Sequence, residues 1–197
     1  MKVKITFFGI LMLLTLIVTK SYLSLAALVA AGLHELGHLA VARFCKVPIK
    51  ELKLDIFGAA ITPAGEFASY KKEIAVALGG PFVNLFCFAA FAPAFIDEHE
   101  FLSFFLAASA FLGVLNLLPI ESFDGGRLIY CLVALFINPH AAEKTLSVLS
   151  VFCLFVLWMI SVYLMIKLGA SLSMFVFSFA LMCKFFTNQK SRMSEDN

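Results

Sequence analysis

Charged residues are scarce in this 197-residue sequence. Only 14% of the residues are Asp, Glu, Lys or Arg, whereas 62% are hydrophobic. Soluble domains average about 25% charged and about 45–50% apolar residues, and a soluble core cannot bury so large an apolar excess. A bilayer core about 30 Å thick needs roughly 20 apolar residues per helix, so the chain accommodates about six spans. The composition therefore predicts an all-α integral membrane protein, a six-span helical bundle.

Cysteine pairs are absent as well. Five cysteines are scattered singly along the chain, with no Cys-x-x-Cys motif: Cys45, Cys87, Cys131, Cys153 and Cys183. This pattern suits neither a disulfide framework nor a thiolate zinc site. The sequence also lacks a Gly-rich phosphate loop, a Ser-x-x-Lys pair and a Gly-x-Ser-x-Gly elbow. We interpret the cysteines as small buried hydrophobic residues.

Apolar runs interrupted by polar residues predict the individual spans. They lie near residues 5–19, 22–44, 73–96, 101–119, 142–166 and 168–187. The first run resembles a secretory signal, but no small-residue cleavage site follows it, so we expect a retained span. Together they predict one polytopic membrane domain, residues 1–187, followed by a short polar cytoplasmic tail, residues 188–197.

The segment between the second and third spans differs from the rest. Residues 46–72 interleave charged and apolar side chains around Phe57 and Gly58. This pattern is typical of a short extended hairpin rather than a helix, and we expect it to dip into the membrane surface.

Basic residues indicate how the spans are oriented. With a cytoplasmic N-terminus, every Lys and Arg except Lys20 and Lys167 falls on the cytoplasmic side, and the acidic loop 97–100 falls on the other. Such a bias is the positive-inside pattern of a multi-pass protein, here of the cell membrane with both termini cytoplasmic. It explains the Lys-rich loop without nucleic acid, so the lipid bilayer is the expected partner.

The most informative motif lies inside the second span. His34, Glu35 and His38 form a His-Glu-x-x-His sequence. Histidines four apart on a helix share one face and can both reach one Zn2+ ion, and the glutamate beside them can take a proton from water that the ion activates. A surface histidine pair or a chance match is the alternative. The apolar span disfavours it, because polar groups at membrane depth cost several kcal/mol and persist mainly when they pair or bind something.

A catalytic zinc ion usually takes three protein ligands, so a third must come from elsewhere. The best candidate is Asp124, which follows Pro119 and precedes Gly125 and Gly126 at the expected cytoplasmic end of the fourth span. Proline stops the helix and the glycine pair lets the backbone turn, which would leave Asp124 on irregular structure. The alternative is that Asp124 caps a short helix from Gly125 to Phe136.

Three other residues could supply the third ligand. His99 falls on the opposite side of the membrane in the predicted topology, and His140 lies in an Asn-Pro-His loop. We expect both to be solvated. Glu121 is closer in sequence to Asp124 and stays open as an alternative.

These motifs together resemble the site-2 proteases, a family of intramembrane zinc metalloproteases, and most closely their compact sporulation-type branch. The resemblance rests on His34-Glu35-Leu36-Gly37-His38, on Gly79-Gly80-Pro81-Phe82-Val83-Asn84, and on Asn116-Leu117-Leu118-Pro119 leading to Asp124-Gly125-Gly126. It covers roughly residues 5–187.

The resemblance implies roles for particular residues. His34, His38 and Asp124 would be the metal ligands and Glu35 the general base, while Asn84 would contact substrate or intermediate. An amide that hydrogen-bonds between helices is the alternative for Asn84. Asn116 is expected to be structural. The hairpin around Phe57 would pair with an unwound substrate strand.

One departure from the family pattern lies in the loop before Asp124. Glu121, Ser122 and Phe123 stand where the family usually has proline and leucine before the aspartate, which alters the shape and charge of this loop.

Two functions of different class follow. In the first, the chain is an intramembrane zinc endopeptidase that cleaves single-span membrane proteins. In the second, it is a non-proteolytic membrane scaffold or carrier that binds zinc. Glu35 favours the first, because a structural zinc site does not require it and usually closes with four ligands. The residues specify neither the substrate sequence nor an oligomeric state.

Overall fold

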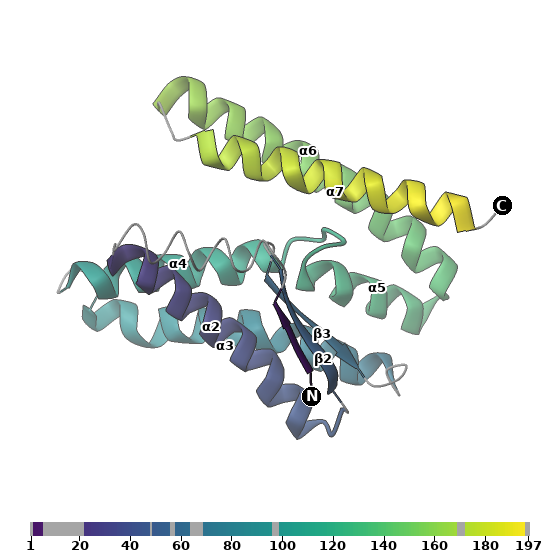
Figure 1. Ribbon diagram of the computed structural model, residues 1–197, viewed down its shortest axis with the longest axis horizontal. Helices are drawn as coiled ribbons and strands as arrows, with labels where there is room; N and C mark the ends of the chain where they lie inside the picture. The colour runs from purple at the N-terminus through teal and green to yellow at the C-terminus, as the bar shows by residue number, and fades with distance from the viewer. Residues whose placement is uncertain are drawn as a thin grey trace. The chain divides into compact units, whose positions relative to one another are not determined.

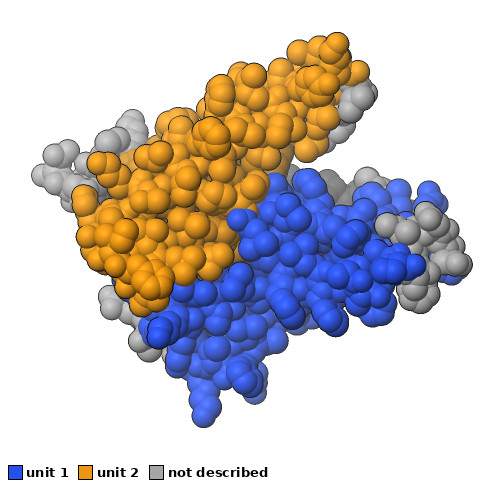
Figure 2. All heavy atoms as spheres, turned by 180° about the vertical axis from the view of Figure 1, so that it is seen from behind, with its two compact units in different colours: residues 1–117 blue, residues 118–197 orange. Residues whose placement is uncertain are grey.

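The computed structural model describes residues 2–5, 22–47, 49–55, 58–63, 69–95, 99–168 and 172–195. In these residues the elements are β1 (Lys2–Ile5), α2 (Tyr22–Phe44), β2 (Ile49–Asp55), β3 (Gly58–Pro63), α3 (Tyr70–Phe95), α4 (Glu100–Asn116), α5 (Asp124–Phe136), α6 (Pro139–Leu168) and α7 (Leu172–Glu195). The chain divides into two compact units, Met1–Leu117 and Leu118–Asn197 (Figure 2).

Three helices form the core of the first unit. α2, α3 and α4 each contact the other two (Figure 1). Their shared cluster joins Ala26 and Ala30 of α2 and Ala92 of α3 to Phe105 and Leu106 of α4. Small residues on two helices let the third place large side chains between them.

The closest approach in this unit lies between α2 and α3. A Cβ atom on Gly37 would collide with the carbonyl oxygen of Gly79, and a Cβ on Gly79 would lie 2.7 Å from the carbonyl oxygen of Gly37. Glycine at both positions therefore permits the backbones to touch. This contact presses the face of α2 that carries the His-Glu-x-x-His motif against α3.

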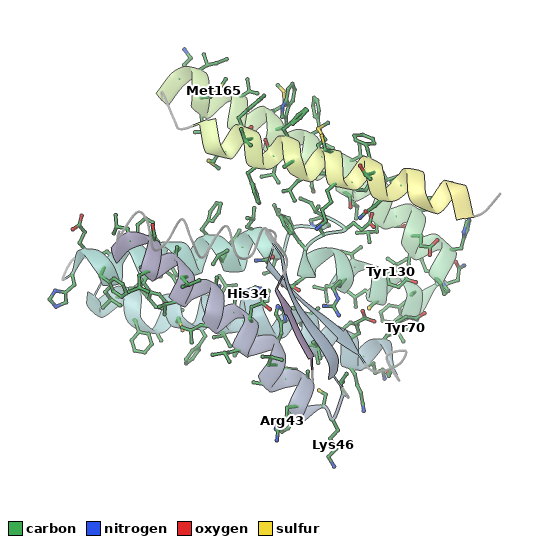
Figure 3. All side chains as sticks on the ribbon, viewed as in Figure 1. His34, Arg43, Lys46, Tyr70, Tyr130 and Met165 are labelled. Atoms are coloured by element: carbon green, nitrogen blue, oxygen red, sulfur yellow. The ribbon has the colours of Figure 1, made fainter. Side chains whose placement is uncertain are left out.

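A left-handed residue ends α2. Lys46 has a φ of 53°, and the amide of Val47 donates to the carbonyl of Ala42 at 2.9 Å. Val47 is buried against Ala42 and Val76, which is the hydrophobic contact that accompanies this type of helix end. Arg43 and Lys46 are exposed at this end of the helix (Figure 3).

A three-stranded sheet belongs to the same unit. Its order is β1-β2-β3; β1 is parallel to β2, with Val3 opposite Leu52. β2 is antiparallel to β3, with Leu52 opposite Ile61. These two strands occupy the segment for which a hairpin was predicted. Phe57 lies outside the described residues, and insertion into the membrane stays a prediction.

β1 was not predicted. Ile5, assigned to the first span from hydropathy, is instead the last residue of this strand. The alternation Lys-Val-Lys-Ile has the period of a strand and includes two β-branched residues, which explains the structure. The rest of the first predicted span, 6–19, lies outside the described residues.

The second unit is built around α6. This helix contacts both α5 and α7, and the antiparallel pair α6 and α7 lies side by side in Figure 1. The hydroxyl oxygens of Ser161 and Ser178 are 3.0 Å apart and buried between the two helices. Leu154 and Leu181 are buried as well.

Among the described residues, three helices are long and apolar enough to cross a membrane, by length and composition. They are α2 over Leu23–Phe44, α3 over Tyr70–Pro93 and α6 over Pro139–Lys167. α4 is apolar but shorter. α7 contains most of the sixth predicted span and continues to Glu195, so the boundary at residue 187 marks the end of the apolar run and not of the helix. The count of six spans stays a prediction.

Candidate metal centre

α2 places its two histidines together in the interior of the first unit. His34 and His38 are 5% and 4% exposed; His34 is labelled midway along α2 in Figure 3. Their rings meet edge to face, with centroids 4.7 Å apart and an interplanar angle of 82°. The two Nε2 atoms are 3.1 Å apart.

This separation suits one shared metal ion. Tetrahedral ligands at about 2.0–2.1 Å from zinc lie about 3.3 Å from each other. The two Nε2 atoms, at 3.1 Å, are already within a few tenths of an ångström of that value. The imidazole pair therefore fits two corners of a zinc site.

α3 supplies the opposing wall. Val76, Gly80 and Asn84 are spaced four residues apart and so share one helix face. A Cβ atom on Gly80 would collide with Nε2 of His38 and lie 2.7 Å from Nε2 of His34. Only glycine leaves room for both imidazole nitrogens at this position.

A backbone carbonyl fixes the protonation of His38. Its Nδ1 lies 2.7 Å from the carbonyl oxygen of Val76, and the amide N–H of Gly80 points to the same nitrogen over a longer distance of 3.3 Å. A carbonyl can only accept, so the shorter contact requires the proton on Nδ1. Nε2 of His38 then carries the lone pair that a metal ion needs.

Asn84 lies against His34. It is fully buried, and its Nδ2 is 3.4 Å from Nδ1 of His34. The hydrogen bond joins α3 to α2, as in the interhelical alternative considered from the sequence.

Glu35 follows His34 along α2. It is partly buried, and its Oε2 atom is shielded from solvent. The structure thus keeps a partly buried carboxylate, next in sequence to His34, in a mostly apolar helix. Such a group is costly at membrane depth unless it interacts with other polar groups or is used in chemistry.

Asp124 belongs to the second unit and opens α5. The residue at the N-cap is Phe123, without a side-chain cap hydrogen bond. Asp124 is therefore neither the cap of a helix beginning at Gly125 nor on irregular structure, as the sequence had suggested. A carboxylate in the first turn is favoured by the helix dipole, which accounts for the earlier start.

The loop before Asp124 is held by its own unit. The hydroxyl of Ser150 on α6 accepts from the amide of Glu121 at 3.0 Å. A Cβ atom on Gly126 would collide with the carbonyl oxygen of Ile120, so Gly126 lets the loop fold back onto the start of α5. Asp124 lies in the second unit, whereas His34 and His38 lie in the first.

The other candidate ligands are placed differently. His99 and His140 are exposed. Oε2 of Glu121 accepts from Nε2 of Gln189 on α7 at 3.5 Å. Asn116 donates to the carbonyl of Leu112 within α4 at 3.0 Å, in agreement with a structural role.

Sequence reasoning missed two parts of the centre, the Val76 carbonyl and the space at Gly80. The carbonyl carries no sequence signal. Gly80 could have been found, because it lies four residues before Asn84 and therefore on the same face of α3.

The chain is similar to known proteins. Residues 22–97, which include both histidines and Asn84, match the family model of Peptidase family M50. Over 117 residues the chain is 33% identical to a protein named putative zinc metalloprotease Rip3 of Mycobacterium tuberculosis, covering 53% of this chain and 28% of that protein. Over 114 residues it is 37% identical to stage IV sporulation protein FB of Bacillus subtilis, covering 55% and 39%.

A solved structure shares the fold. The site-2 protease of Methanocaldococcus jannaschii superposes with a TM-score of 0.67 at 20% identity, covering 94% of this chain and 89% of that one. The curated relatives are longer proteins, of which this chain spans 28% and 39%. Residues 22–97 thus match the Peptidase family M50 model, and the predicted resemblance of the chain to the site-2 proteases is confirmed.

Proposed function

We propose that this protein is an intramembrane zinc endopeptidase that cleaves single-span membrane proteins. One observation carries the proposal: two buried imidazoles on an apolar helix present their Nε2 atoms 3.1 Å apart, and Glu35 is the next residue after the first of them. A buried histidine pair with an adjacent carboxylate is the core of a hydrolytic zinc site.

Asp124 would complete the protein ligands. His34 and His38 would bind through Nε2, and the Asp124 carboxylate would supply the third donor from the start of α5. Three protein ligands leave a fourth position open, which distinguishes a catalytic zinc site from a structural one. A bound zinc ion lowers the pKa of a water molecule to about 7 and polarises a peptide carbonyl.

Glu35 would act as general base and then as general acid. Its carboxylate accepts a proton from the attacking water and passes it to the leaving amine as the peptide bond breaks. The partly buried position of Glu35 limits its exchange of protons with bulk solvent. His34 and His38 would hold the metal and would not act as the base.

Substrate would bind as an extended strand. β3 is the last strand in the order β1-β2-β3, so in the described part of the chain it forms an edge of the sheet. An edge strand offers backbone groups to an added strand, and a peptide bond must leave its helix before it can be attacked. We propose that an unwound segment of a single-span protein adds there, near the cytoplasmic leaflet.

The first test is Glu35→Gln, which keeps the side-chain shape and removes the base. We expect purified wild type and Glu35→Gln to hold equal zinc by elemental analysis, with cleavage of a single-span substrate lowered about 10²–10⁴-fold in the variant. Glu143→Gln on α6, where the glutamate is exposed, is the matched control and should cleave normally.

Each other outcome has a distinct meaning. Zinc in wild type without cleavage of a panel of single-span substrates would support a non-proteolytic zinc scaffold or carrier. Retained cleavage in Glu35→Gln would remove Glu35 from its assigned role. Wild type without zinc would overturn the proposal.

A further inference from the structure

Asn84 has an unusual hydrogen-bonding position. Its side chain is fully buried, its Nδ2 atom faces Nδ1 of His34 at 3.4 Å, and its Oδ1 atom has no hydrogen-bond partner among the described residues. A buried amide oxygen without a partner costs about 1–3 kcal/mol. The position calls for an explanation beyond packing.

The contacts of the two imidazoles determine which ring nitrogen of each carries the proton. His38 carries its proton on Nδ1, because that atom is 2.7 Å from the Val76 carbonyl. Since Nδ2 of Asn84 donates to Nδ1 of His34, the proton of His34 must be on Nε2. That proton then points to the lone pair on Nε2 of His38, 3.1 Å away.

A metal ion requires a different state of His34. Both Nε2 atoms must offer lone pairs to the ion, so the proton of His34 has to move to Nδ1. A metal-bound histidine almost always donates its other ring N–H to an acceptor. His38 meets this condition already through Val76, whereas His34 needs an acceptor at the place where Asn84 now presents a donor.

We propose that Asn84 is a positioning residue that fixes the tautomer of His34 and reverses with metal binding. A half-turn of its amide about χ2 exchanges Nδ2 and Oδ1, so that Oδ1 accepts from Nδ1–H of His34 and no longer lacks a partner. The inference rests on the proposed zinc site. It assigns Asn84 to the metal centre rather than to the substrate.

An amide side chain can take both parts at this position. Asparagine has a donor and an acceptor on the same planar group, aspartate has acceptors alone when ionised, and leucine has neither. Asn84→Asp therefore keeps the acceptor that loaded His34 needs, and Asn84→Leu removes it with the same branching and number of side-chain heavy atoms.

Zinc affinity, measured by chelator competition on full-length protein in detergent, tests the role. We expect Asn84→Leu to bind zinc about 10–100-fold more weakly, and Asn84→Asp to stay within a few-fold of wild type. Ser109→Ala is the control, because Ser109 is fully buried on α4 and its hydroxyl also lacks a partner among the described residues. It should bind like wild type.

Equal affinity in wild type and Asn84→Leu would overturn the inference while leaving the zinc site intact. Absence of zinc from wild type would instead overturn the proposed function together with it.

The tautomers themselves give a second test, which needs no substitution at Asn84. The chain has four histidines, so 15N-histidine NMR in a His99→Gln, His140→Gln background reports on the pair alone. We expect His34 to be protonated on Nε2 without metal and on Nδ1 with zinc, while His38 stays protonated on Nδ1. His34 protonated on the same nitrogen in both states would refute the proposal.

Discussion

At the scale of single residues, His34 and His38 both direct Nε2 toward the candidate metal position, but different groups contact their Nδ1 atoms. A backbone carbonyl holds His38, and a side-chain amide lies against His34. The carbonyl of Val76 is present whatever side chain stands there, so His38 is insensitive to substitution of its partner. Substitutions can therefore change the groups around the histidines at Asn84 and at the third ligand, but not at the carbonyl of Val76.

Removing the third ligand should release metal. We expect Asp124→Ala to fall well below one zinc per chain by elemental analysis, because two imidazoles alone do not complete a stable site. Glu121→Ala is the matched control, since its carboxylate accepts from Gln189, and it should keep its zinc. Loss of metal in Glu121→Ala with full metal in Asp124→Ala would exchange the two roles.

The residue pattern predicted the histidine pair but not the groups of α3 that contact it. Histidines four apart must share a helix face, so His34 and His38 could be paired from the sequence alone. Which face of α3 meets them depends on tertiary packing. The Val76 carbonyl and the contact between Asn84 and His34 therefore emerged only in three dimensions.

At the scale of elements, two glycines let α2 and α3 touch, and a third leaves room for metal chemistry. Gly37 and Gly79 bring the backbones into contact, while Gly80 faces the imidazole nitrogens. Helix packing and the metal centre thus depend on adjacent residues of α3.

A methyl group at Gly80 should displace the imidazoles. We expect Gly80→Ala to lose most of its zinc while the protein remains folded in detergent, because the added Cβ would occupy the space beside both Nε2 atoms. Gly32→Ala on α2 is the control: nothing lies within 4 Å of its Cβ position. It should keep its zinc, with stability changed by no more than about 1 kcal/mol. Normal zinc binding by Gly80→Ala would contradict the geometry.

Helix bounds could be predicted where apolar runs and helices coincide. The runs 22–44 and 73–96 correspond to α2 over Tyr22–Phe44 and α3 over Tyr70–Phe95. Hydropathy could not reveal β1, because this strand has only four residues and directly precedes a long apolar run. Nor could it find the end of α7, because its last residues are polar but are good helix formers.

At the scale of the whole molecule, the candidate ligands come from both compact units. His34 and His38 lie in Met1–Leu117, and Asp124 lies in Leu118–Asn197. The family match of residues 22–97 falls in the first unit. Family recognition thus rests on the imidazole half of the site, and the carboxylate half depends on the second unit.

The predicted orientation can be tested on the intact chain. With both termini cytoplasmic, a fluorescent protein fused after Asn197 should fluoresce in cells, and alkaline phosphatase fused there should be inactive, because it folds only outside the cytoplasm. Phosphatase fused after Glu100, in the predicted external loop, is the positive control. An active phosphatase at Asn197 would invert the topology or change the number of spans.

The close pairing of α2 and α3 also bears on biosynthesis. Every contact described for the imidazole pair comes from residues of these two neighbouring helices. The contacts between α2 and α3 can therefore form before α5, which carries Asp124, has folded. The imidazole pair would thus be arranged first, and the proposed metal site would be completed only when the ligand from the second unit folds against it.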